Sequence, residues 1–443
     1  MQSMNSRTNS KLLIIFALFA ISIVIGLLNS TDPIITNILE LFLGILAVLL
    51  IFQFPIIGLA IITLSAPLTD IFSRITFVNS IIPYIGLLTF FSYIINVNYR
   101  KRIKFNLTTT EIVGLIFIIW IIFSHPNASI FGVERSWAFT LTQLWILMWM
   151  ARQFICTEKE HRQVIIILAI GILFSAVYAI QNTGLHLNLQ NRAIGLGAGA
   201  NTSARYFIYG ILLLIYLQNY FSKKIILRLV LIFTIFVELI AVILTGSRTG
   251  IILLGIVAIF LLGQLFTKKK PIFVIIVFIL GSTWYLTQAK TTSLQPQNII
   301  SAITDGTDTV GYRYDLWKAG LKIAYDHPFA GVGIGNFDKF LPYYWGSNSV
   351  IKANTSHNSF IEVLAETGVI GLFLFITLIL LSFIKFITNQ HNLQVELIEI
   401  KKIWFAILIV LIIGSFTKAD LIDKLFWFML GLTFLNKTPN STN

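Results

Sequence analysis

Residues 225–245 read IILRLVLIFTIFVELIAVILT, and this stretch decides the fold class. It is almost wholly apolar and is as long as the roughly 20 residues that a helix needs to cross the hydrocarbon core of a bilayer. Similar runs recur along the whole chain. The sequence therefore predicts an all-α, polytopic transmembrane helix bundle, and we expect no part of the chain to fold as a soluble domain.

The predicted number of membrane helices is twelve to fourteen. The candidate apolar runs lie near residues 11–28, 35–52, 54–68, 78–97, 110–124, 136–151, 163–181, 204–219, 225–245, 249–267, 271–287, 358–385, 403–414 and 421–436. The runs 54–68, 403–414 and 421–436 are short for a membrane crossing, so a bundle of twelve helices also fits the sequence.

The composition agrees with a membrane protein. Of the 443 residues, 56% are hydrophobic and 12% are charged, whereas a soluble globular protein carries roughly 25% charged residues. The net charge of +13 sits mostly in short loops between apolar runs. This pattern is typical of positive-inside topology signals, so we expect membrane lipids and no nucleic acid as partners. The only cysteine, Cys156, cannot form an internal disulfide.

The basic residues predict one orientation in an inner membrane. With the N-terminus inside, the clusters that fall on the inner face are Arg100–Lys104, Arg152–Arg162, Lys223–Arg228, Lys268–Lys270 and Lys385–Lys402. Both termini are then cytoplasmic, and the apolar run 12–28 is the first membrane helix rather than a removed signal peptide. The outer face receives the loop 182–203, the turn at 246–249 and the large helical loop 288–356.

These assignments predict four segments within a single integrated membrane domain. Residues 1–185 are N-terminal membrane helices, and 186–287 are membrane helices with arginine-bearing outer loops. Residues 288–356 are the large extracytoplasmic loop, and 357–443 are the C-terminal membrane helices.

The large loop contains a predicted amphipathic helix, GYRYDLWKAGLKIAY at 311–325. At 100° per residue, one face holds Leu316, Trp317, Gly320 and Ala324, and the opposite face holds Asp315, Lys318 and Lys322. Arg313 falls in the middle of the apolar face. It either lies at the helix start and reaches to water, or it is held over a cavity to meet an anion.

A glycine-rich segment, GVGIGNF at 331–337, follows this helix. It resembles a dinucleotide-binding loop only superficially, because its spacing is wrong and no strand is evident before it. A turn that redirects the chain after the helix is the favoured interpretation.

His357 opens the next predicted helix, which Ser356 or Asn354 can cap. On a helical wheel His357 shares a face with Ile361, Leu364, Gly368 and Gly371, and Glu362 and Glu366 lie on the other side. The two glycines would allow close approach of a neighbouring helix. The helix dipole disfavours a protonated imidazole here, so a neutral His357 can accept a proton. A packed histidine that only hydrogen-bonds the loop is the alternative.

Three further arginines fall on the same predicted outer face. The turn TGSRTG at 245–250 carries Ser247 and Arg248 between two apolar runs, and an arginine this close to hydrocarbon is a candidate site residue. The glycine-rich segment 191–205 carries Arg192 and Arg205. Arginine pairs phosphate oxygens bidentately, and a histidine can deprotonate a hydroxyl. The combination favours a lipid diphosphate donor; interfacial anchoring of Arg248 and a purely structural glycine-rich loop are the alternatives.

At this point the sequence resembles the O-antigen ligase and polymerase superfamily over about residues 185–385. His357-Asn358 followed by Gly368-x-x-Gly371 is similar to the histidine motif of the family. The features of the preceding loop that match are Tyr312-Arg313, Trp317, Asp326-His-Pro328 and the segment 331–337. The Ser247-Arg248 turn and the segment from Arg192 to Asn201 match in order and position.

The resemblance implies metal-independent, inverting glycosyl transfer from an undecaprenyl-diphosphate-linked glycan, without a cofactor. By that analogy His357 is the general base, and Arg248, Arg313 and Arg192 bind the diphosphate. The supporting residues would be Asn358, Ser247, Trp317, Arg205 and Asn201. The acceptor would be lipid A core or another glycan.

Other functions stay open at this stage. A polymerase that extends the glycan on its lipid carrier shares the donor chemistry of a ligase, so the sequence hardly separates the two. A polysaccharide transporter or flippase would predict charged or broken helices at the membrane midplane, whereas the charges here cluster at the outer rim. A membrane scaffold would give no reason for His357 and Arg313 to face inward.

Overall fold

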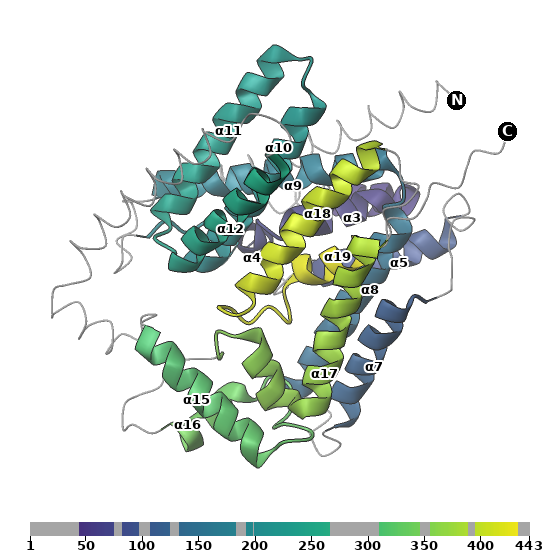
Figure 1. Cartoon of the computed structure of the whole chain (residues 1–443). Helices are drawn as coiled ribbons and strands as arrows, with labels where there is room; N and C mark the ends of the chain where they lie inside the picture. The colour runs from purple at the N-terminus through teal and green to yellow at the C-terminus, as the bar shows by residue number, and fades with distance from the viewer. Residues whose placement is uncertain are drawn as a thin grey trace, which may run out of the picture. The chain divides into compact units, whose positions relative to one another are not determined.

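The computed structural model describes nine stretches of the chain. They are residues 44–74, 82–96, 107–124, 133–182, 192–197, 199–265, 310–345, 355–388 and 395–432. Helices dominate these stretches, and no strand occurs in them, so the all-α prediction is confirmed for the part of the chain that is described (Figure 1). The predicted membrane runs 11–28 and 271–287 lie outside these residues.

The described residues fall into two compact units. The first lies within Met1–Ser65 and Thr69–Lys104, and the second within Ala66–Leu68 and Phe105–Asn443. The helices of the first unit are Gly44–Gln53, α3 (Pro55–Ser65), α4 (Thr69–Arg74) and α5 (Ile82–Ile95). The predicted four-segment division of the chain stays a prediction.

Close contact of α3 and α5 holds the first unit together. A Cβ built on Gly58 would collide with the side chain of Thr89, so only glycine fits at this crossing. Helix α5 also contacts the helix Gly44–Gln53: the hydroxyl of Ser92 lies 2.8 Å from the carbonyl oxygens of both Ile51 and Phe52. Small and hydroxylated residues at a helix crossing are typical of helix packing in lipid.

The second unit contains the remaining helices. They are α7 (Thr109–Phe123), α8 (Val133–Phe154), α9 (Glu158–Asn182), α10 (Ala200–Tyr220), α11 (Ile225–Leu244), α12 (Arg248–Leu265), α15 (Val310–Asp326), α16 (Phe337–Tyr344), α17 (Ser359–Thr388), α18 (Val395–Gly414) and α19 (Lys424–Leu432). Each predicted membrane run within the described residues overlaps a helix.

Three of the described helices are long and apolar enough to cross a membrane. They are α9, α11 and α17. Shorter apolar helices among the described residues include α3, α5 and α7. The structure therefore supports a membrane protein, and the total of twelve to fourteen crossings stays a prediction.

Polar contacts join helix ends that the basic clusters place on one face of the membrane. Arg152, near the end of α8, donates from Nε to Oε1 of Glu111 at 2.6 Å, and both side chains are buried. Arg162, in the first turns of α9, donates to the Tyr220 hydroxyl at the end of α10 (2.6 Å). These ends of the helices therefore lie together, as antiparallel neighbours require.

The predicted amphipathic helix of the large loop is confirmed as α15. Leu316, Gly320 and Ala324 are buried and Trp317 is half-buried, while Asp315, Lys318 and Lys322 are exposed. The buried face of α15 packs against α16, α17 and the turn that follows α15, and together they form a small core. The core residues are Leu316, Ala319, Ile323, Val332, Phe337, Leu341 and Ala365. In Figure 1 α15 and α16 lie side by side near one end of α17.

Helix α17 is broken at Gly368, where φ is 69° and ψ is −172°. The break removes the helical partners of three carbonyl groups, and groups from elsewhere in the second unit replace them. The amides of Val332 and Gly333 donate to the carbonyls of Ala365 (3.0 Å) and Glu366 (2.9 Å). The indole of Trp120, on α7, donates to the carbonyl of Thr367 at 3.0 Å. The turn after α15 is thus attached to α17 by main-chain hydrogen bonds.

Two glycines make this attachment possible. A Cβ on Gly368 would collide with the carbonyl group of Phe329, and a Cβ on Gly331 would collide with the backbone of Glu366. Both glycines have positive φ, which disfavours any side chain. The glycine-rich segment 331–337 is therefore a turn, as predicted. The prediction that Gly368 admits a neighbouring helix is wrong, because the backbone of the loop occupies that space.

We expect Gly368→Ala to destabilise the attached loop by at least about 2 kcal/mol, since the new methyl group meets backbone atoms at a strained φ. Limited proteolysis of the purified protein in detergent measures the effect as faster cleavage within residues 310–345. Gly86→Ala is the matched control, because a Cβ there meets no atom within 4 Å. Equal cleavage rates for the Gly368 variant and the wild type would contradict this account of the break.

Candidate functional site

The predicted start of the histidine-bearing helix needs correction. Helix α17 begins at Ser359, and Asn358 precedes it. The side-chain oxygen of Asn358 accepts hydrogen bonds from the amides of Phe360 (2.9 Å) and Ile361 (3.2 Å), so Asn358 is the N-cap. The predicted capping by Ser356 or Asn354 is therefore wrong. His357 does not share a helical face with Ile361, because it lies before the helix.

His357 has a left-handed backbone conformation, with φ of 54°. It is the single non-glycine residue with positive φ in the described stretches. This conformation costs a residue with a Cβ of order 1–3 kcal/mol and persists where the surroundings over-determine it. Such residues cluster at functional sites, which supports a special role for His357.

Hydrogen bonds hold the backbone on both sides of His357. The amide of Ser356 donates to Oε2 of Glu362 at 2.8 Å. The amide of Asn358 donates to the hydroxyl oxygen of Ser356 at 3.1 Å, closing a tight turn around His357. The indole of Trp317, on α15, donates to the carbonyl of Ser356 at 3.1 Å. Trp317 therefore supports the segment Ser356–Asn358 around His357, through a hydrogen bond to its backbone.

Two buried carboxylates connect α17 to the loop. Glu362 binds Ser356, and Oε1 of Glu366 accepts from the amide of Phe337, the first residue of α16, at 3.0 Å. The sequence prediction put both carboxylates on the side away from the histidine face and gave them no role. The signal that could have identified them is their position on an otherwise apolar helix, where an ionisable side chain is costly unless it has a partner.

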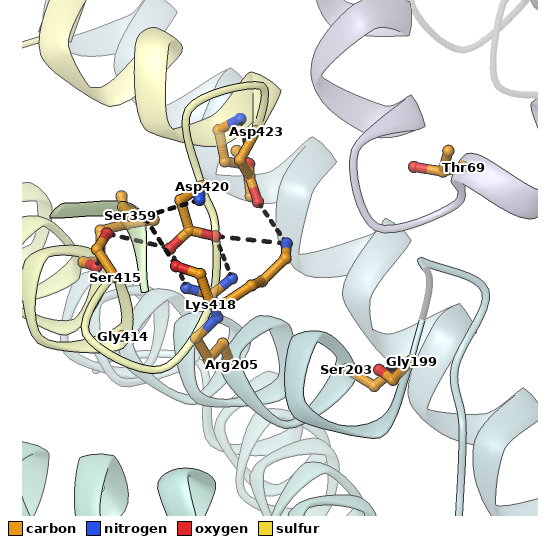
Figure 2. A network of polar contacts seen from close by, with 12 residues as sticks. Thr69, Gly199, Ser203, Arg205, Ser359, Gly414, Ser415, Lys418, Asp420 and Asp423 are labelled. Carbon is orange, nitrogen blue, oxygen red and sulfur yellow. Dashed lines mark hydrogen bonds and ion pairs between the residues drawn. The ribbon is translucent and has the colours of Figure 1, made fainter. Parts of the chain in front are cut away.

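A second network anchors the start of α17 to α10 and to the connection between α18 and α19 (Figure 2). Arg205, on α10, forms a bidentate ion pair with Asp420 at 2.5 and 2.7 Å, and both side chains are buried. The amide of Asp420 donates to the hydroxyl oxygen of Ser359 at 2.8 Å. The amide of Ser359 donates to the carbonyl of Ser415 at 2.8 Å. These bonds fix the first residue of α17, two residues after His357.

This network changes the interpretation of Arg205. The sequence prediction placed Arg205 in the glycine-rich segment as a supporting residue of the diphosphate site, whereas it lies on α10, which begins at Ala200. Asp420 occupies its guanidinium in fork geometry. Arg205 therefore holds the start of α17 in place. Asp420 was missed by the sequence reasoning, although it falls on the same predicted face as Arg205.

The ion pair also sets the ionisation of Asp420. Burial by itself raises the pKa of this carboxyl, but the charge of Arg205 and its hydrogen bonds outweigh burial, so the pKa of Asp420 lies below its ordinary value. A lowered pKa contributes stability that is present at neutral pH and is lost as the pH falls through that pKa.

A third group of contacts joins the segment before α10 to the turn between α11 and α12. Arg192 donates from Nε to the carbonyl of Thr245 (2.7 Å) and from Nη2 to Oδ1 of Asn201 (3.2 Å). The hydroxyl of Ser247 donates to the same oxygen of Asn201 at 2.8 Å. The structure thus brings together Arg192, Asn201 and Ser247, which the sequence prediction assigned to one site.

Arg248 and Arg313 each lie in the first turn of a helix. Arg248 is the first residue of α12 and is exposed, next to the bonded Ser247. Arg313 lies in the first turn of α15 and is half-buried. Their side-chain roles stay predictions. In the described stretches, no three His, Cys, Asp or Glu side chains group together as metal ligands.

Comparison with a protein-family model tests the resemblance to the O-antigen ligase family. A model of the family described as O-antigen ligase matches residues 229–376. The match confirms that this region resembles the O-antigen ligase and polymerase superfamily. It includes Arg248, Arg313 and His357, whereas Arg192, Arg205 and Asp420 lie outside it. The family is membrane-embedded, which agrees with the long apolar helices among the described residues.

A relative gives a second, partial match. A protein of Haemophilus influenzae, described as uncharacterized, is 27% identical over 171 residues. The match covers 35% of this chain and 43% of the relative, so the chain spans less than half of the length of that protein. This likeness adds no activity of its own.

We expect Asp420→Asn to destabilise the protein by about 3–5 kcal/mol, because it leaves the Arg205 guanidinium buried without a charged partner. Thermal unfolding in detergent at neutral pH measures the loss, and the difference from wild type shrinks as the pH falls through the lowered pKa of Asp420. Glu399→Gln is the matched control, because its pair with Lys402 is exposed and contributes about 0–1 kcal/mol. An unfolding temperature equal to that of wild type would show that the pair does not anchor α17.

Proposed function

We propose that the protein is an inverting, metal-independent glycosyltransferase of the O-antigen ligase type. The donor is a glycan linked to undecaprenyl diphosphate, and the acceptor is a hydroxyl of lipid A core or of another glycan. The observation that carries the proposal is the conformation of His357. This strained histidine lies two residues before α17, hydrogen bonds hold the backbone on both sides of it, and it falls within the residues that the family model matches.

The proposed reaction takes place in one displacement. The imidazole of His357 removes the proton of the acceptor hydroxyl, and the acceptor oxygen attacks the anomeric carbon of the donor. The bond from that carbon to the diphosphate oxygen breaks, and its electron pair leaves with undecaprenyl diphosphate. Attack on the face opposite the leaving group inverts the anomeric configuration. Histidine suits the role of the base, since a neutral imidazole is available near physiological pH to accept the proton.

Arginines stabilise the leaving diphosphate in this proposal. Arg248 and Arg313 bind its oxygens, because the guanidinium fork matches phosphate geometry. Arg192 supports them, and its bonds to Thr245 and Asn201 hold the turn from which Arg248 projects. Ser247 and Asn201 complete that turn. Neither a metal nor a cofactor has a part in the proposed step.

The proposal implies a location and an orientation. The protein is a multi-pass protein of the bacterial inner membrane, both termini are cytoplasmic, and residues 288–356 lie outside. Two sets of contacts support this orientation. Helix α17 contacts Ser415 and Asp420, and Asp420 also pairs with Arg205. The basic clusters predict that all of these positions lie on one face of the membrane.

Polymerisation of the glycan on its lipid carrier is the second candidate, because it uses the same donor and leaving group. The glycan phenotype of a deletion strain separates the two. Loss of polymer from lipid A while carrier-linked polymer accumulates indicates a ligase, and single repeat units indicate a polymerase. If the protein were a transporter, its deletion would instead cause the cargo to accumulate on the inner face.

We expect His357→Ala to abolish glycan transfer and to leave expression and membrane insertion intact, because it removes the proton acceptor. His357→Asn is the sharper variant, since asparagine tolerates the left-handed conformation but is no base. It should be inactive and as stable as wild type. Transfer with purified donor and acceptor, alongside thermal unfolding, gives both readouts. Full activity in His357→Ala would remove the general-base assignment.

We expect Arg313→Lys to reduce transfer at least about tenfold, which corresponds to about 1.4 kcal/mol of lost leaving-group stabilisation, since lysine cannot form a bidentate contact. Lys318→Arg is the matched control, because Lys318 lies on the exposed face of the same helix. The measurement is the initial rate at saturating acceptor. A wild-type rate for Arg313→Lys would make diphosphate binding the wrong role for this residue.

A further inference from the structure

The tip of the large loop, defined as residues 325–329, exposes two large aromatic side chains. Tyr325 is 86% exposed and Phe329 is 69% exposed. Tyr325 is the penultimate residue of α15, and Phe329 lies in the turn that follows it. Burying one large aromatic side chain contributes roughly 1.5–3 kcal/mol, so two exposed ones close together call for a partner.

Main-chain contacts place the loop tip against the break in α17. The amide of Val369 donates to the carbonyl of Pro328 at 2.8 Å. The carbonyl oxygen of Phe329 approaches Gly368 so closely that no Cβ fits there. Both contacts are between backbone groups, so the position of the tip relative to Gly368 does not depend on a flexible side chain.

The break also marks the start of the membrane-spanning part of α17. Glu362 and Glu366 both lie before Gly368, whereas the segment Val369–Thr388 is apolar with Lys385 as its one charged residue. This segment has the roughly 20 residues that a membrane crossing requires. Its first turns have exposed apolar side chains, with Val369 at 47% and Phe373 at 68% exposure. Gly368 is therefore at the boundary of the hydrocarbon.

The exposed side of α15 is itself divided. Leu321 and Tyr325 are four residues apart and form an apolar strip. Lys318, Lys322 and Asp326 form a charged strip beside it. A helix that faces water alone has no need of this division, whereas a helix lying at a bilayer surface puts its aromatic side chains among the headgroups and its charges toward water.

From these four observations we infer that the loop tip is a membrane-docking surface. Tyr325 and Phe329 enter the headgroup region of the outer leaflet, continuous with the lipid-exposed face of Val369 and Phe373. The partner is the lipid bilayer itself. The docked tip keeps the loop at the depth where the diphosphate of a lipid-linked substrate lies. The docking itself does not rest on the proposed transfer reaction.

Nitroxide labelling tests the inference. The single native cysteine allows this design: Cys156→Ser gives a background without thiols, and Phe329→Cys, Tyr325→Cys and Asp315→Cys each add one label. Asp315 is the matched control, because it is exposed on the same helix, one turn before Lys318 of the charged strip. The full-length protein is placed in nanodiscs of phosphatidylethanolamine and phosphatidylglycerol. Collisions with oxygen, which concentrates in lipid, and with a water-soluble nickel chelate are measured.

We expect labels at 329 and 325 to lose access to the nickel chelate and to gain access to oxygen, relative to the label at 315. Labels at 329 and 325 that reach the chelate as readily as the label at 315 would overturn the inference. Because accessibility is measured without substrate, this result is independent of glycan transfer. If the label at 329 is shielded but the wild-type protein is inactive in transfer, the proposed function alone is refuted.

Discussion

The structure of the second unit depends on the break in α17 at Gly368. An uninterrupted helix would use the carbonyls of residues 365–367 internally, and the loop would then have no main-chain groups to bind. The break frees them, and Val332, Gly333 and Trp120 satisfy them. Backbone irregularity near lipid is tolerated only where such partners exist. The loop, α7 and α17 are thus held together by one group of hydrogen bonds.

The candidate site is built on this attachment. Glu362 and Glu366 stand on the segment before the break and bind the amides of Ser356 and Phe337. The ion pair of Arg205 with Asp420 fixes the first turn of the same segment. His357 lies between these anchors in a strained conformation. Buried carboxylates with backbone partners make the histidine segment rigid, and rigidity is what a positioned base requires.

Several parts of this arrangement were predictable because they depend on local pattern. The amphipathic faces of α15 follow from helical periodicity, and the turn at 331–337 follows from its glycines. Arg192 and Ser247 both donate hydrogen bonds to Asn201, which agrees with the assignment of these three residues to one site. The predicted start of α17 is two residues too early, because the side chain of Asn358 caps the helix and leaves His357 outside it.

The sequence by itself determined the all-α class, the apolar helices and the two faces of α15, because composition and periodicity are local properties. Only the tertiary structure decided that Arg205 pairs with Asp420, that Glu362 holds Ser356 and that Gly368 breaks α17 to receive the loop. Each of these joins segments far apart in the chain or depends on a backbone angle set by such contacts. Hydrogen-bond partners and close approaches of this kind are fixed by packing, which no local pattern encodes.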